Sequence, residues 1–320
     1  MTGVQPSGGT CQSRPVGWNQ FWFAPSDSTS LAVIRIGCGI LVLGYLLSYG
    51  SDAPRWLANT ASVVPTSTVR ELMARSWAEF SIFDYCSSPA AVWTVHGAAL
   101  LAALAMTLGV ATRVSTAVTW LLLLSYLHRV PFANGLAEPV LAMLLAYLVI
   151  EPGARSLSLD RWWVLKRGGR PGDPIGWTAT VATRLIQLHL CALVLMTVTN
   201  RLAGEPWWSG TAVWWLIART ETRLIDLTGL GSLPQYYLVN LWTHAVVAIE
   251  LLGVVLLWLP RFRPGTQIAL GVIWFSLALL TGQLLWLGIM LLGLVAFVPP
   301  TVLSRLLGRA AVGSGRAQPA

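Results

Sequence analysis

Eight strongly apolar stretches occupy most of the chain and are separated by short polar segments. A helix needs about 20 apolar residues to cross a bilayer, because lipid cannot satisfy unpaired backbone donors and acceptors. The pattern therefore predicts an all-α, polytopic transmembrane helical bundle with about eight spans plus short interfacial helices. Whether residues 266–298 form two spans or one long broken helix is left open. The predicted spans are residues 31–49, 90–110, 114–127, 136–150, 177–199, 235–259, 266–280 and 284–298.

Three parts are predicted along the chain. Residues 1–29 are polar with Pro, Gly and Ser and form a cytoplasmic segment, residues 30–300 form the transmembrane domain, and residues 301–320 form a basic cytoplasmic tail. The first segment lacks the basic-then-apolar order of a cleaved signal peptide. The first span is therefore expected to target the chain to the membrane.

Basic residues fall on alternate connections between the predicted spans. With the N-terminus inside, 12 Arg and Lys side chains lie on the inner side against 7 on the outer side, and the acidic residues divide as 4 against 8. The loop charges are then +8 inside and −1 outside. Because cytoplasmic loops retain positive charge, both termini are predicted to be cytoplasmic. Twenty Arg against one Lys is typical of a GC-rich bacterial genome and favours a bacterial inner membrane.

The composition agrees with a membrane protein and argues against other classes. Hydrophobic residues make up 55% of the chain and charged residues 11%, whereas a soluble domain carries roughly a quarter charged residues. The net charge of +8 is explained by loops that face the membrane, so no nucleic-acid partner is expected. The four cysteines include no CxxC pair, and the four histidines lack metal-ligand spacing. Neither a dithiol relay nor a metal site is predicted, and the sequence identifies no cofactor.

Charged side chains within the predicted spans are costly in lipid and are therefore candidates for function. Arg35 lies near the inner end of the first span and is either a structural, snorkelling arginine or a functional one. Arg184 and Glu250 lie in the fifth and sixth spans, at depths that differ by only about 3 Å at 1.5 Å per residue. They are predicted to form a buried ion pair, which is either a structural clasp or a gate.

A second polar set lies in the outer half of the predicted bundle. Asn240 and His244 share one face of the sixth span, Asn200 and Arg201 end the fifth, and His96 lies in the second. Each residue alone is more typical of an interhelical hydrogen bond. Their common depth predicts an outward-facing polar pocket. In this pocket His244 and His96 are the candidate acid–base groups, and Arg201 is the candidate anion or oxyanion clamp.

A Trp-rich segment follows Arg201. Its two Trp pairs recur at a spacing of seven residues, which predicts a short helix in the outer interface with both pairs on one face. The segment is either a membrane anchor or a lid over the pocket. As a lid, Trp207, Trp208 and Trp214 join Asn200 and Asn240 as candidate ligand-binding residues.

Several short patterns occur in a defined order along the chain. They are FWFAP at 21–25, LAVIRI at 31–36, LG at 108–109, TRVS at 112–115, Arg129 with NG at 134–135, EPG at 151–153, SLSLD at 156–160 and WWSGTAVWW at 207–215. In this order they resemble the horizontally transferred transmembrane (HTTM) domain, whose members are bacterial relatives of the membrane portion of vitamin K-dependent gamma-carboxylase. The resemblance covers residues 20 to about 300, although each pattern alone has low specificity.

The resemblance implies a related membrane site without the carboxylase chemistry. In the carboxylase, a lysine pair before the Trp-rich segment supplies the base that starts vitamin K oxygenation, and the matching positions here resemble Asn200-Arg201-Leu202. Arginine, with a pKa above about 12, does not deprotonate in proteins. The one lysine, Lys166, lies in a loop predicted on the opposite side of the membrane. A lysine-dependent carboxylase is therefore not expected.

These observations predict an integral membrane protein of the HTTM family that binds a quinone- or lipid-like amphiphile in the outer-half pocket. Whether it also modifies this ligand is open, and membrane lipids are its other expected partners. The alternatives are a transporter gated by Arg184 and Glu250, and a non-catalytic membrane scaffold. The sequence shows no convincing inverted repeat and no pair of Gly/Pro-broken spans that would favour the transporter.

Two reporter fusions test the predicted topology. A reporter that is active only in the cytoplasm should work when fused at residue 320 and fail when inserted near residue 226, because basic loops stay inside. Activity at the second position, or none at the first, would contradict the orientation.

Overall fold

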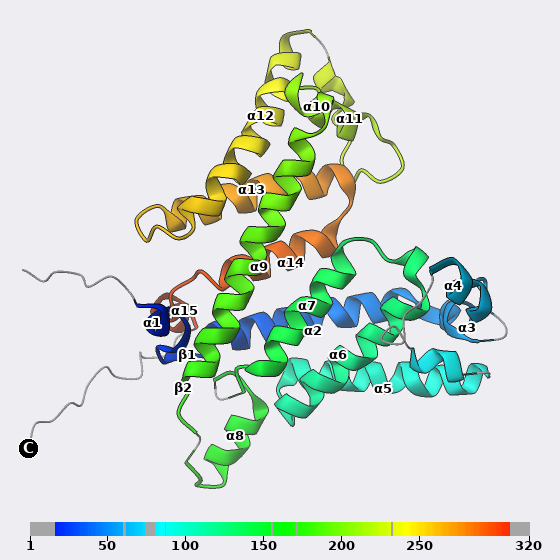
Figure 1. The fold of residues 1–320 in the computed structure, drawn as a ribbon, viewed down its shortest axis with the longest axis vertical. Coiled ribbons are helices and arrows are strands. Elements are labelled where there is room, and N and C mark those ends of the chain that lie inside the picture. The colour runs from blue at the N-terminus through cyan, green and yellow to red at the C-terminus, as the bar shows by residue number, and fades with distance from the viewer. Residues whose placement is uncertain are drawn as a thin grey trace, which may run out of the picture.

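The computed structural model describes residues 17–59, 62–73, 81–86, 88–154, 156–170, 172–231 and 233–307, which are mostly helical (Figure 1). Residues 1–16 of the predicted N-terminal segment and 308–320 of the predicted tail lie outside the described residues. The long helices are α2 (Thr29–Ser48), α5 (Pro89–Leu108), α6 (Thr112–Arg129), α7 (Ala137–Ile150), α9 (Trp177–Leu202), α12 (Leu233–Leu256), α13 (Arg263–Thr281) and α14 (Leu284–Val295).

Short elements connect the long helices. Strands β1 (Ser26–Asp27) and β2 (Ile175–Gly176) pair antiparallel and join the chain before α2 to the chain before α9. The short helices are α1 (Trp18–Phe23), α3 (Ala53–Leu57), α4 (Thr66–Met73), α8 (Leu159–Lys166), α10 (Glu205–Trp208), α11 (Ala212–Ala218) and α15 (Pro300–Leu306), with 3₁₀ turns at Gly50–Asp52, Ile82–Tyr85, Pro131–Ala133 and Thr228–Gly231.

Each predicted apolar stretch forms a helix, but fewer than eight of these helices qualify as membrane spans. Within the described residues, α2, α5, α9, α12 and α13 are long and apolar enough to cross a membrane, as expected of a membrane protein. A sixth candidate joins α14 and α15 across a bend of 113°. Helix α7 has 14 residues, or about 21 Å at 1.5 Å per residue, and is shorter than the roughly 30 Å hydrocarbon core.

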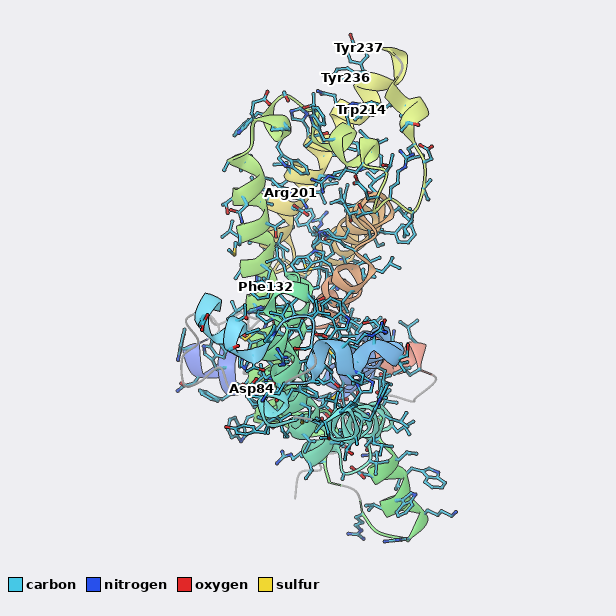
Figure 2. All side chains as sticks on the ribbon, turned by 90° about the vertical axis from the view of Figure 1, so that its right-hand side faces the viewer. Asp84, Phe132, Arg201, Trp214, Tyr236 and Tyr237 are labelled. Carbon is cyan, nitrogen blue, oxygen red and sulfur yellow. The ribbon has the colours of Figure 1, made fainter. Side chains whose placement is uncertain are left out.

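The long helices form two groups with separate apolar cores (Figure 1). Helices α2, α5, α6 and α7 pack in sequence in the first group, and α9, α12, α13 and α14 form the second. Helix α14 also packs against α2, and α7 packs against α9, so these contacts join the groups. In Figures 1 and 2, α9 runs steeply across the direction of α2 and α5.

A glycine turn divides the last apolar region into two helices. Gly282 adopts a φ of +69° between α13 and α14, and a Cβ at this position would lie 2.5 Å from the carbonyl oxygen of Thr222. A side chain is excluded there by both the backbone conformation and the close approach. Residues 266–298 therefore form two separate helices rather than one long broken helix.

Arg35 ties α2 to the segment between α7 and α8. Its side chain is fully buried and donates to the carbonyl oxygens of Pro152, at 3.4 Å, and of Leu157. Nearby, the hydroxyl oxygens of Thr29 and Ser156 lie 2.9 Å apart. Because the Arg35 guanidinium contacts protein backbone inside the fold, the structure favours the structural alternative for this residue.

Asp160 caps the N-terminus of α6 next to Arg35. Its carboxylate accepts hydrogen bonds from the backbone nitrogens of Ala111 and Thr112, both at 2.9 Å, and from the Thr112 hydroxyl at 2.7 Å. Burial raises the pKa of Asp160, but these hydrogen bonds and the nearby Arg35 outweigh it, and the net pKa is lowered. The backbone nitrogen of Asp160 also donates to Gly109 O at 3.0 Å. Five of the short sequence patterns quoted above thus meet around Arg35 and Asp160.

Replacing Arg35 should destabilise the protein strongly. Arg35→Gln should lower the free energy of unfolding by about 2–5 kcal/mol, because it leaves buried carbonyl oxygens without donors. The matched control is Arg55→Gln, which removes an exposed arginine paired with Asp52 at 3.1 Å and should change stability by less than about 1 kcal/mol. Unfolding of the purified protein in detergent gives the comparison, and equal losses in the two variants would contradict the structural role.

Candidate functional site

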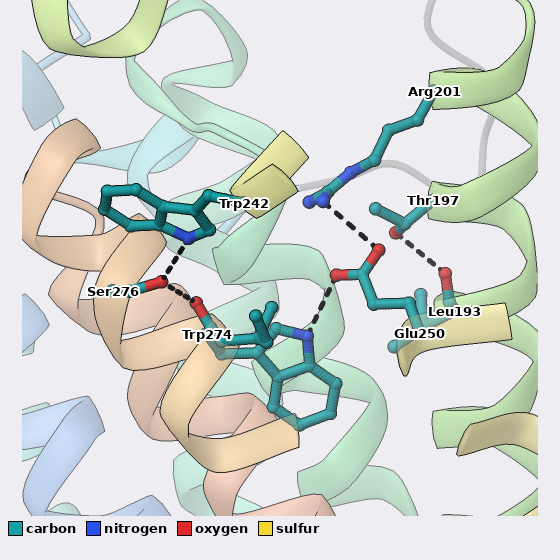
Figure 3. Close-up of polar contacts among 8 residues, drawn as sticks. Leu193, Thr197, Arg201, Trp242, Glu250, Trp274 and Ser276 are labelled. Carbon is teal, nitrogen blue, oxygen red and sulfur yellow. Dashed lines mark hydrogen bonds and ion pairs between the residues drawn. The ribbon is translucent and has the colours of Figure 1, made fainter. Parts of the chain in front are cut away.

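A buried ion pair joins α9 to α12. Arg201 Nη1 lies 3.2 Å from Glu250 Oε2, and the two side chains are 16% and 2% exposed. The indole nitrogen of Trp274 on α13 donates to Glu250 Oε1 at 3.0 Å (Figure 3). Although close, Arg201 Nη1 and Glu250 Oε2 are not aligned for a hydrogen bond. The contact is therefore mainly electrostatic, and Trp274 supplies the directional hydrogen bond to the carboxylate.

An aromatic ring fixes the other side of the arginine. The guanidinium carbon of Arg201 lies 4.6 Å from the ring centroid of Trp207, which belongs to α10. Such stacking is favourable because the ring face is electron-rich. Figure 2 shows Arg201 pointing from the C-terminal part of α9 into the upper half of the molecule. Glu250 and Trp207 therefore hold the guanidinium in one position.

Two cavities meet at Arg201. The larger, of about 400 Å³, lies between the start of α7, the end of α9 and the start of α14. The smaller, of about 170 Å³, extends toward α11 and α13. Arg201, Gln283 and Trp286 line both cavities. The larger is also lined by Gly135, Leu136, Ala137, Glu138, Thr197, Gly282, Leu284 and Leu285, and the smaller by Trp207, Leu216, Trp274, Leu277, Ala278 and Thr281.

The predicted pairing of Arg184 with Glu250 is wrong, because Glu250 pairs with Arg201. Arg184 instead donates to Gln187 Oε1 at 2.9 Å and to the carbonyl oxygen of Phe21 at 3.3 Å. Its guanidinium carbon also lies 4.5 Å from the Phe21 ring centroid. Arg184 therefore anchors α1 against α9.

The longitudinal offset between α9 and α12 explains the change of partner. The Sγ atom of Cys191 lies 3.8 Å from Val254 O, so these two residues are level in the antiparallel pair. Glu250 precedes Val254 by one helical turn and is therefore closer to the C-terminal end of α9, within reach of the long Arg201 side chain. The predicted pairing of Arg184 with Glu250 requires the N-terminal end of α9 to be level with the C-terminal end of α12, and these two ends are not level.

His96 lies apart from Arg201. It is buried in α5, and its Nδ1 atom lies 2.7 Å from the hydroxyl of Tyr126 on α6. Neither cavity at Arg201 includes His96 in its lining. The residue therefore belongs to the first helix group, where it joins α5 to α6, and it does not share a pocket with Arg201.

Asn240 and His244 share a helix face, as predicted, but they support a turn. Asn240 Nδ2 donates to Ser209 O at 3.1 Å, and His244 Nδ1 donates to Asn240 O at 3.0 Å. Gly210 has a φ of +76°, and a Cβ at this position would lie 1.8 Å from Asn240 Nδ2 and 2.8 Å from His244 Cε1. Neither side chain lines the two cavities at Arg201. Of the five residues of the predicted pocket, only Arg201 lines these two cavities.

The turn at Gly210 also divides the Trp-rich segment into α10 and α11, so the predicted single helix is wrong. One member of each Trp pair packs inward: Trp207 stacks on Arg201, and Trp214 packs against a small apolar cluster around Val213. Trp208 and Trp215 are exposed. Only Trp207 of the predicted ligand-binding tryptophans lines a cavity at Arg201.

Asn200 is exposed on α9 and is absent from the lining of both cavities. The site residues that sequence reasoning missed are Thr197, Trp274, Gln283 and Trp286. Among these four, Gln283 was the easiest to find from the sequence, because it is a polar residue that follows Gly282 at the break between two apolar stretches.

Among the described residues, no group of three or more His, Cys, Asp or Glu side chains could hold a metal ion.

Comparison of the chain with protein-family models, curated proteins and solved structures finds no match in any of the three. The resemblance to the HTTM domain therefore stays a prediction that depends on the quoted sequence patterns.

A double-mutant cycle tests the observed pairing. Glu250→Gln alone should destabilise the protein by about 3–5 kcal/mol, because it leaves the Arg201 guanidinium without its partner. Adding Arg201→Met should recover much of this loss. The control cycle combines Glu250→Gln with Arg184→Met and should be additive within about 0.5 kcal/mol, because those two residues do not touch. Coupling in the control cycle, or none between Arg201 and Glu250, would contradict the structure.

Proposed function

We propose that the protein is an integral membrane protein of the HTTM family that binds a quinone- or lipid-like amphiphile at Arg201. The observation that carries the proposal is a largely buried arginine, fixed by Glu250 and Trp207, that lines a cavity of about 400 Å³. This volume lies within the roughly 300–1,000 Å³ of small-molecule sites in proteins. The span-like helices around it support a ligand that is soluble in the membrane.

The lining of the cavity suits a molecule with one polar end and an apolar body. Polar groups come from Arg201, Glu138, Thr197 and Gln283, and apolar surface comes from Leu284, Trp286 and their neighbours. A few placed polar groups within a mostly apolar wall are typical of sites that orient an amphiphilic ligand.

The charge of the site narrows the class of polar group that it accepts. Glu250 compensates the charge of Arg201 at 3.2 Å, so the pair offers N–H donors without a net positive charge. A neutral acceptor, such as the carbonyl oxygen of a quinone or ester, gains a hydrogen bond there. A full anion would face repulsion from Glu250 in a medium of low dielectric constant.

The site does not favour lysine-dependent carboxylation. An arginine that remains protonated can polarise a carbonyl oxygen but cannot accept a proton. Lys166 ends α8, at the opposite end of the molecule from the C-terminus of α9 (Figure 1), and its ammonium lies 4.9 Å from the Trp162 ring centroid. Neither predicted acid–base histidine lines the cavity. The site therefore supports the binding of an amphiphile more than it supports a chemical modification of that amphiphile.

The transporter alternative loses the feature that motivated it, because Arg184 and Glu250 have separate partners.

The proposed location is the inner membrane of a bacterium with both termini in the cytoplasm, and its support is the distribution of Arg and Lys along the sequence. A scaffold without a ligand differs from the proposal in one measurable respect, since it would purify without a stoichiometric amphiphile.

Arginine variants test the proposal through ligand binding. Arg201→Ala should weaken the binding of decyl-benzoquinone about tenfold or more, because it removes a charged donor from a buried site. Arg201→Lys should weaken it less, since it keeps a cation opposite Glu250. Lys166→Arg is the control and should bind normally. Quenching of tryptophan fluorescence in lipid nanodiscs measures the affinity.

Stability is separated from binding by a second comparison. Glu250→Gln and the double variant Arg201→Met, Glu250→Gln both lack the ion pair, but only the double variant lacks the guanidinium. The double variant should bind more weakly than Glu250→Gln. Absence of quinone binding by the wild-type protein, or equal binding by both variants, would contradict the proposed function.

A further inference from the structure

A third cavity lies on the other side of the start of α7. It is a half-open groove of about 420 Å³, bordered mainly by α6, α7 and the turn between them. Its walls are mostly apolar, and His128 and Asn134 are the lining residues with polar side chains. The lining residues that the argument uses are Trp120, Leu124, Asn134, Gly135, Met143 and Ala146.

The amide of Asn134 adds little polarity to this cavity. Asn134 Nδ2 donates to the carbonyl oxygens of Leu127, at 3.0 Å, and Val130, at 2.9 Å. Its Oδ1 atom accepts from the Tyr45 hydroxyl at 3.0 Å. Because these atoms already have partners, Asn134 fixes the turn before α7. Apart from His128, the remaining lining of the cavity is apolar and suits a hydrocarbon chain.

Gly135 borders both this cavity and the larger cavity at Arg201. Because it is a glycine, no side chain projects at the border that the two cavities share. A Cβ built there would meet only Glu138 Oε2, at 3.5 Å, and the backbone of Gly135 does not adopt a positive φ. A larger side chain can therefore be accommodated by the backbone and would project at the border.

We propose that the two cavities form one site for a single long-chain amphiphile, whose polar head lies at Arg201 and whose chain passes Gly135 to lie between α6 and α7. The inference rests on the proposed function, because the head occupies the site at Arg201. It adds the class of ligand: one extended chain, longer than the cavity at Arg201 can enclose. Trp120, Leu124 and Met143 contact the far part of the chain.

The dependence of affinity on chain length tests this site. The probes are benzoquinones that carry an ethyl, hexyl, decyl or tetradecyl chain, and their affinities in nanodiscs are expressed against the free aqueous concentration of each probe. Affinity for the wild-type protein should rise with chain length, up to about fourfold for each fully buried methylene. The rise should end when the cavity between α6 and α7 is filled.

Two variants should shorten the usable chain. Gly135→Leu places a side chain at the border, and Ala146→Leu fills part of the cavity wall. Both should bind the ethyl probe within about twofold of wild type and should lose the gain in affinity between hexyl and decyl. The matched control is Gly44→Leu, at an exposed position of α2 where a Cβ meets nothing within 4 Å. This variant should keep the full chain-length dependence.

The outcomes separate this inference from the proposed function. If no probe binds the wild-type protein, both fail. A second outcome is that the probes bind through Arg201 but both variants, Gly135→Leu and Ala146→Leu, keep the wild-type dependence on chain length. If wild-type melting temperatures show that these variants are folded, this outcome overturns the extended site and leaves the head site standing. If Gly135→Leu does not fold, Ala146→Leu decides the question alone.

Discussion

Glu250 lies almost entirely inside the protein, where an unpaired carboxylate costs several kcal/mol. Three helices therefore meet at this carboxylate, which belongs to α12: Arg201 on α9 pairs with it, and Trp274 on α13 donates a hydrogen bond to it. Trp207 on α10 then covers the arginine. The position of the Trp-rich segment over the second helix group therefore depends on the same charge pair that defines the candidate site.

The pair also shapes the chemistry that the cavity supports. A lone arginine in an apolar site would attract anions, whereas an arginine beside a carboxylate offers hydrogen-bond donors at little net charge. Because a guanidinium stays protonated at all physiological pH values, those donors remain in place. The site is therefore suited to holding a neutral, carbonyl-bearing head while the surrounding apolar walls take up the rest of the molecule.

Helix formation was largely predictable from the sequence, because it depends on local hydrophobicity. All eight apolar stretches became helices, and the shared face of Asn240 and His244 follows from helical periodicity. The partner of Glu250 was not predictable in the same way, since the longitudinal offset between α9 and α12 is set by packing. Gly210 broke the Trp-rich segment because Asn240 and His244 occupy the space of its missing side chain. His96 contacts Tyr126 on a neighbouring helix, and this contact could not be predicted from the depth of His96 in its span.

Photo-crosslinking with an azido-benzoquinone tests most directly whether the ligand's polar head lies at Arg201. The two segments that meet there, around Thr197 on α9 and around Gln283 and Trp286 at the start of α14, are distant in sequence and share a cavity through the fold. Mass spectrometry of the labelled protein should find crosslinks in both segments, and unlabelled quinone should suppress them together. Labelling confined to exposed surfaces such as those of α5, with no competition by unlabelled quinone, would contradict the account.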